Sequence, residues 1–226
     1  MPRGSFERQL DRLQEDMLVL GSMVEDALIK SVETLKQRDL EGARRVIAED
    51  RRINEKRFAI EGNALALIAT QQPLASDLRI IAAVLDIATE LERIGDYAKG
   101  IAKINLMMGE KPLLKPLIDI PRMAIKARDM LHQALGAFLE RDVAKAQAIP
   151  KEDDEVDALY NQVYHELITL ILSNPSTVDR ATYLLWVAHN LERASDRVTN
   201  ICERVVFTVT GKMVEMDVDL GYSGIH

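Results

Sequence analysis

The chain has 226 residues with 47% apolar, 29% charged and 4% aromatic side chains, a composition typical of a helical globular protein. Its net charge of −7 argues against nucleic acid as a partner, because no basic surplus is present to displace phosphate counterions. The single cysteine, Cys202, excludes an intrachain disulfide and a cysteine-rich metal site, and we find neither a signal peptide nor an apolar run long enough for direct membrane insertion.

Apolar residues spaced three and four apart predict three long helices in the first part of the chain. We expect these helices over about 5–37, 39–70 and 76–106. Asp39 is the predicted N-cap of the second helix, and Ser76 or Asp77 that of the third. A Pro- and Gly-containing segment then predicts a linker over 109–116.

The rest of the chain repeats this plan. We expect helices over about 117–140, 142–174 and 177–209, followed by a tail over 211–226. No segment alternates like a strand, so the predicted fold class is all-α. It consists of two tandem, internally duplicated three-helix bundles of long antiparallel helices, six helices in all. The predicted domains are residues 1–108 and 117–210.

Two carboxylate pairs stand one hundred residues apart in closely similar surroundings. Leu-Glu-Arg-Ile-Gly-Asp at 91–96 is matched by Leu-Glu-Arg-Ala-Ser-Asp at 191–196. Because residues four apart share a helix face, each Glu-x-x-x-Asp presents two carboxylates side by side. Such like charges repel unless a cation, an arginine or a proton neutralises them. The repeated arrangement therefore indicates an internal duplication with a functional purpose.

The second and fifth helices add further oxygen ligands when they are aligned through their starts at Asp39 and Asp142. At a rise of 1.5 Å per residue, Asp50 and Asp96 lie roughly 30–32 Å from the turn that joins the second and third helices. Asn54 and Glu92 lie roughly 24–26 Å from the same turn. Four oxygen-bearing side chains thus converge at one level in each bundle. They are Asp50, Asn54, Glu92 and Asp96 in the first, and Asp153, Asp157, Glu192 and Asp196 in the second.

Oxygen-only clusters of this kind suit Mg²⁺, Mn²⁺, Ca²⁺ or iron better than zinc, and adjacent pairs can bridge more than one metal. The alternative is that arginines neutralise the acids on solvated faces. The candidates for that role are Arg51, Arg52, Arg93, Arg193 and Arg197. His189 lies three residues before Glu192, the reverse of the ferritin-type Glu-x-x-His order, and we interpret it as an ordinary polar or packing residue.

Residues 90–99 and 190–201, together with Ser-Asp-Leu-Arg at 76–79, resemble the PhoU family of accessory regulators of bacterial phosphate-specific transport. The resemblance extends over about residues 5–210. It implies a fold of two three-helix bundles, with metal motifs on the acidic residues named above. Asn54 departs from the acid expected at its position, and Gly100 stands where the second half has Asn200. The implied metal is iron, manganese, magnesium or zinc, in a cluster that can be multinuclear.

What the resemblance implies for function is a cytoplasmic, non-enzymatic negative regulator of the phosphate-starvation response. Its implied partners are the phosphate-specific ABC transporter and a sensor histidine kinase, and it is expected to form a homodimer. The transporter would bring it to the inner face of the membrane. Two alternatives stay open at this point: a metalloenzyme of phosphoryl chemistry that uses the carboxylates, and a purely structural helical scaffold.

Overall fold

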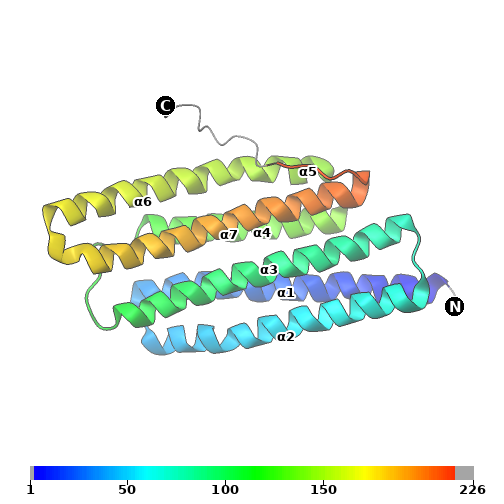
Figure 1. The fold of residues 1–226 in the computed structure, drawn as a ribbon, viewed down its shortest axis with the longest axis horizontal. Coiled ribbons are helices and arrows are strands. Elements are labelled where there is room, and N and C mark those ends of the chain that lie inside the picture. The colour runs from blue at the N-terminus through cyan, green and yellow to red at the C-terminus, as the bar shows by residue number, and fades with distance from the viewer. Residues whose placement is uncertain (1–2, 217–226) are drawn as a thin grey trace.

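The computed structural model describes residues 3–216, and this part of the chain is almost entirely helical (Figure 1). The elements are α1 (Arg3–Gln37), α2 (Leu40–Gln71), α3 (Ala75–Met108), α4 (Asp119–Glu140), α5 (Val143–Ala148), the 3₁₀ turn η1 (Ile149–Glu152), α6 (Asp153–Ser173), the 3₁₀ turn η2 (Pro175–Thr177) and α7 (Val178–Thr210). The all-α prediction is confirmed. Residues 217–226 of the predicted tail lie outside the described residues.

The same turn introduces the second helical segment of each half. Arg38 and Arg141 both adopt the left-handed conformation, with φ of 58° and 54°. The next residue is an aspartate whose side chain caps the new helix: Asp39 accepts from the backbone N–H of Gly42 at 2.8 Å, and Asp142 accepts from that of Lys145 at 2.9 Å. Each cap satisfies a backbone donor that the first helical turn leaves without an intrahelical partner. The alignment through these two aspartates therefore has a structural basis.

Two local predictions were wrong. The helix expected over 142–174 is divided into α5, η1 and α6, because Pro150 lacks a backbone N–H and its ring clashes with the carbonyl of the preceding turn. As a result Asp153 is the first residue of α6 rather than an interior one. The N-cap of α3 is Leu74, which has no side chain that could cap, so Ser76 and Asp77 lie inside the first turn.

Helices α1, α2 and α3 form one bundle, and α4, α6 and α7 form the other (Figure 1). The bundles are joined along two seams, α3 against α7 and α1 against α4. At the second seam a Cβ atom on Gly21 would lie 2.3 Å from Leu135 Cδ1, so the glycine permits close approach. One continuous cluster of buried apolar side chains runs through both bundles, from Leu10 to Val206. The two halves consequently share a hydrophobic core.

Helices α3 and α7 are antiparallel, and their contact is centred on the repeated motif. Polar contacts between them include Arg204 Nε with Asp86 Oδ2 (3.4 Å), Asn200 Nδ2 with Glu90 Oε2 (3.3 Å) and Arg197 Nε with the Tyr97 hydroxyl (3.4 Å). The two residue numbers of each contact have nearly the same sum, as expected for antiparallel helices. For two residues that are one hundred positions apart, this sum is reached near Gly95 and Ser195. The two Glu-x-x-x-Asp motifs therefore lie at the same level on neighbouring helices, related by an approximate twofold axis.

Candidate functional site

In the first half, the α2 and α3 carboxylates are brought together around a lysine. Lys99 Nζ lies 2.6 Å from Asp50 Oδ2 and 3.7 Å from Asp96 Oδ1. The side-chain amide of Asn54 donates to the same Asp50 Oδ2 at 3.1 Å. The hydrogen bond to Asp50 raises the pKa of Lys99, so the ammonium stays charged at neutral pH. The predicted common level of Asp50 and Asp96 is thus observed, with a cation from the chain itself between them.

Glu92, the remaining predicted ligand of this half, lies beside that group. Burial raises the pKa of its carboxyl, and the negative charge of Asp96 raises it further. Arg93 opposes this effect from 3.9 Å away. Glu92 therefore experiences the like-charge repulsion that the i, i+4 spacing implies.

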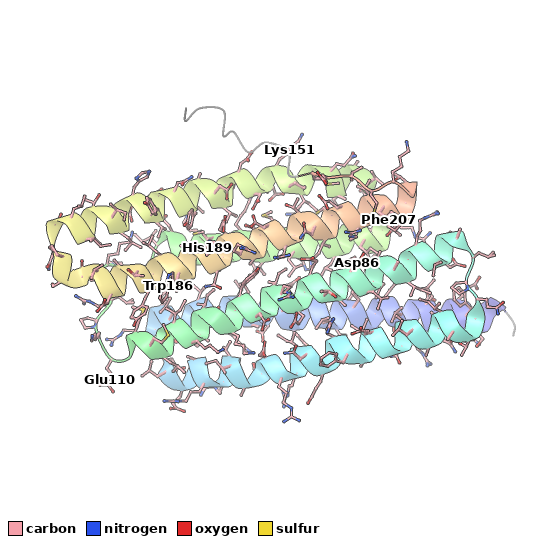
Figure 2. All side chains as sticks on the ribbon, in the orientation of Figure 1. Asp86, Glu110, Lys151, Trp186, His189 and Phe207 are labelled. Atoms are coloured by element: carbon pink, nitrogen blue, oxygen red, sulfur yellow. The ribbon has the colours of Figure 1, made fainter. Side chains whose placement is uncertain are left out.

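In the second half, Glu192 of α7 faces the start of α6. Burial raises the pKa of Glu192, and the charges of Asp157 and Asp153 raise it further. Burial of the phenol raises the pKa of Tyr160, and the charge of Glu192 raises it further. His189 Nδ1 lies 3.1 Å from Glu192 Oε2. Figure 2 labels His189 on α7, where it also contacts the ring of Tyr160 with 6.4 Å between the centroids.

Next to these residues is a cavity of about 610 Å³, whose wall carries four acidic side chains and one lysine, Lys151. Asp153, Asp154 and Asp157 of α6 and Thr199 of α7 contribute to its lining, and the segment after α7 adds Glu215. That segment is tied down by a hydrogen bond from the backbone N–H of Met216 to Glu203 Oε1, at 2.9 Å. Asp196, the last predicted ligand, has Arg193 Nε 4.0 Å away.

The two sets of side chains differ in how they suit a metal ion. In the first half, Lys99 stands between Asp50 and Asp96, so these residues as they stand do not fit a metal. In the second half the donors are carboxylate oxygens beside an open cavity, and this chemistry suits a hard cation. Within residues 3–216, no three His, Cys, Asp or Glu side chains are gathered closely enough to hold one ion. Ligation would therefore require rotation of exposed carboxylates such as Asp157.

The arginines considered in the sequence neutralise the motifs only loosely. Arg51 instead pairs with Glu55 at 2.8 Å, and Arg197 pairs with Glu90 at 3.4 Å. The residue that sequence reasoning missed is Lys99. A signal for it was present, because the repeat places Thr199 opposite Lys99 and so changes the charge three residues after the matched aspartates. His189 was noticed, but its contact with Glu192 was not expected.

Between the two carboxylate groups, polar contacts join α3 to α7 and fix the spacing of the groups. Tyr97 receives a hydrogen bond from Arg197, and the guanidinium of Arg193 lies over its ring, 5.9 Å from the centroid. Glu90 accepts from both Arg197 and Asn200. These contacts hold α3 to α7 directly beside the repeated motifs.

Comparison with known proteins finds the same duplication that the motif, the capped turn and the two bundles show. Residues 17–104 match the family model of the PhoU domain, and residues 120–205 match it a second time. The chain belongs to the PhoU family. The two matches agree with the internal duplication inferred from the carboxylate pairs.

Relatives within the PhoU family are similar over nearly their whole length. A phosphate-specific transport system accessory protein PhoU homolog from Clostridium acetobutylicum is 38% identical, with 96% of this chain and 100% of that protein covered. The Escherichia coli accessory protein PhoU is 34% identical over 92% of this chain and 87% of its own length. The crystal structure of the phosphate transport system regulatory protein PhoU from Streptococcus pneumoniae superposes with a TM-score of 0.86 at 32% identity, covering 92% of this chain and 99% of that one.

This PhoU-family chain is accordingly an accessory protein of phosphate transport, of a regulatory and non-enzymatic kind. The metalloenzyme alternative is set aside on the family membership. None of the helices within residues 3–216 has the length and apolar character needed to cross a membrane.

Proposed function

We propose that this chain is a cytoplasmic regulator of phosphate uptake that represses the phosphate-starvation response when phosphate is plentiful. It would act by contact with the phosphate-specific ABC transporter and a sensor histidine kinase, and it would form a homodimer. The observation that supports this most directly is the double match to the PhoU domain, which covers both halves of the chain. The full-length similarity to phosphate-specific transport accessory proteins supports the same assignment.

The proposal includes a metal-dependent contact surface on the second half. The residues that would hold iron, manganese, magnesium or zinc are Asp153, Asp157, Glu192 and Asp196. A bound cation would supply the positive charge that allows these carboxylates to lie close together. Since Glu192 is on α7 and its acidic neighbours are on α6, neutralisation would stabilise the contact between these two helices. Metal binding by the first-half set stays a prediction that requires displacement of Lys99.

Repression can be measured in a bacterium from which the gene for this chain has been deleted and which carries a reporter of the phosphate-starvation response. With phosphate in excess, the wild-type chain is expected to restore repression. The double variant Asp157→Ala/Glu192→Ala is expected to leave the reporter on, with an unchanged far-ultraviolet circular dichroism spectrum. The matched control is Glu33→Ala/Glu140→Ala, which removes two exposed acids from α1 and α4, on the other layer of the molecule.

A wild-type chain that is folded and expressed but does not repress the reporter would contradict the regulatory proposal. If the carboxylate variant represses as well as the control, the regulator would work without this surface, as the scaffold alternative requires. Crosslinking in membranes from the same cells would test the transporter contact. Elemental analysis of protein purified without an affinity tag would identify the metal, and light scattering would report the dimer.

A further inference from the structure

The two halves differ in charge at two places just after the repeated Glu-x-x-x-Asp motif: Tyr97 is matched by Arg197, and Lys99 is matched by Thr199. One hundred residues after Lys99 the chain has Thr199, although Glu92 and Asp96 are matched by Glu192 and Asp196. The neighbouring ligand position also makes the first half more positive, because Asn54 in the first half corresponds to Asp157 in the second. At positions 99 and 54 the first half therefore has one more positive charge and one fewer negative charge than the second. Arg197, the extra positive charge of the second half, pairs with Glu90 of α3.

Lys99 occupies the place that a cation would take in the first half. Its ammonium is within hydrogen-bonding distance of Asp50 Oδ2, at 2.6 Å, and is 3.7 Å from Asp96 Oδ1. The Asp50 side chain is only 7% exposed, and a buried carboxylate is strongly destabilising unless a charge and hydrogen bonds compensate it. The second compensating donor is the amide of Asn54, at 3.1 Å from the same oxygen. An aspartate at position 54 would add a fourth carboxylate to Asp50, Glu92 and Asp96, without a proton to donate.

Position 199 has different surroundings. Thr199 is buried and contributes to the wall of the cavity of about 610 Å³ that Asp153 and Asp157 also line. A threonine supplies a hydroxyl but no charge, so the cation at the equivalent place is not provided by this residue. The cavity leaves room beside the carboxylates for a hydrated ion, or for a longer side chain at position 199.

We infer that Lys99 is a built-in substitute for a bound cation, so that the first half functions without metal and only the second half takes one up. The part that concerns the second half rests on the metal site proposed above. The part that concerns Lys99 rests only on the geometry of the first half. The two halves of the duplicated fold would then be one permanently neutralised site and one that responds to metal.

The test exchanges the two positions and uses Mn²⁺ alone as the probe, on full-length protein that has first been freed of metal. Lys99→Thr/Asn54→Asp gives the first half the residues of the second. Thr199→Lys gives the second half the lysine of the first, and Thr199→Gln is its uncharged control. Lys99→Met removes the charge of Lys99 but keeps an unbranched side chain only one atom shorter. Bound Mn²⁺ is counted by elemental analysis after dialysis, and the melting temperature is measured with and without the ion.

In metal-free protein, Lys99→Met is expected to lower the melting temperature by about 4–8 °C, since Asp50 loses its ion pair. Thr199→Lys is expected to lose the Mn²⁺ that the wild type binds, while Thr199→Gln keeps it. Lys99→Thr/Asn54→Asp is expected to bind about twice as much Mn²⁺ as the wild type, and Mn²⁺ should restore its melting temperature.

The outcomes distinguish the inference about Lys99 from the proposed metal site of the second half. If the wild type binds no Mn²⁺ but Lys99→Thr/Asn54→Asp does, the second-half metal site fails and the substitution role of Lys99 stands. If wild-type Mn²⁺ is lost in Glu92→Ala, the first half binds metal despite Lys99 and the inference is overturned. The inference is also overturned if Lys99→Thr/Asn54→Asp binds no more Mn²⁺ than the wild type and has the same melting temperature as the wild type. Should Thr199→Lys not fold, the first-half variants decide alone.

Discussion

Gly100 lies inside α3, where it faces α7 at the seam between the two bundles. A Cβ atom at this position would lie 3.1 Å from Asn190 Oδ1, closer than ordinary van der Waals contact. Asn190 is held in place by a hydrogen bond from its Nδ2 to the carbonyl of Trp186, at 2.7 Å. We therefore predict that the effect of Gly100→Ala depends on the residue at position 190.

The magnitude follows from two opposing effects. Replacing a glycine inside a helix by alanine stabilises the helix by about 1 kcal/mol. Against this, Asn190 must move by a few tenths of an ångström, which weakens a hydrogen bond that contributes about 0.5–1.5 kcal/mol. Gly100→Ala alone should thus change the free energy of unfolding by less than about 0.5 kcal/mol. In an Asn190→Ala background the obstacle is absent, and the gain of about 1 kcal/mol should raise the melting temperature by about 2–4 °C.

The assay is a double-mutant cycle over wild type, Gly100→Ala, Asn190→Ala and the double variant, with thermal and urea unfolding of each protein. The coupling energy is expected to be about 0.5–1 kcal/mol. Equal stabilisation by Gly100→Ala in both backgrounds would refute the reasoning, because the close approach of Asn190 would then not be what the glycine serves.

Further predictions concern three local features. Burial raises the pKa of Cys202 to about 12 from an ordinary 9.0, so alkylation by iodoacetamide at pH 8 should be about a thousandfold slower in the native protein than in urea. The stability due to this buried thiol is complete below pH 9.0 and should fall by about 1.4 kcal/mol per pH unit as pH rises towards 12, a decline that Cys202→Ala should lack in urea titrations. Asp39→Ala and Asp142→Ala should each lower the free energy of unfolding by about 1 kcal/mol, measured in urea, whereas the corresponding asparagines should lower it much less. Arg197→Met should destabilise the α3–α7 seam by about 1 kcal/mol, and a variant as stable as the wild type would show that its contacts with Glu90 and Tyr97 contribute nothing.

The sequence was sufficient for features that depend on neighbouring residues. The caps at Asp39 and Asp142 are set by a side chain that reaches its own helix terminus, so their spacing alone predicts them. The common level of Asp50 and Asp96 follows from the constant rise of two antiparallel helices joined by a short turn. Pro150 is also a local signal, but the fifth helix was predicted as continuous by its correspondence with the second helix. The boundaries of the two domains stay a prediction.

By itself, the sequence determined the helical class, the duplication and the level at which the carboxylates lie, because periodicity and spacing are properties of single helices. Only the tertiary structure decided what meets those carboxylates. Lys99 reaches across from α3 to Asp50 on α2, whereas the equivalent Thr199 borders a cavity. The fusion of both bundles into one core was likewise decided by how α3 and α7 approach. A helical period specifies which face is apolar, but not which neighbouring helix covers it or which long side chain extends between them.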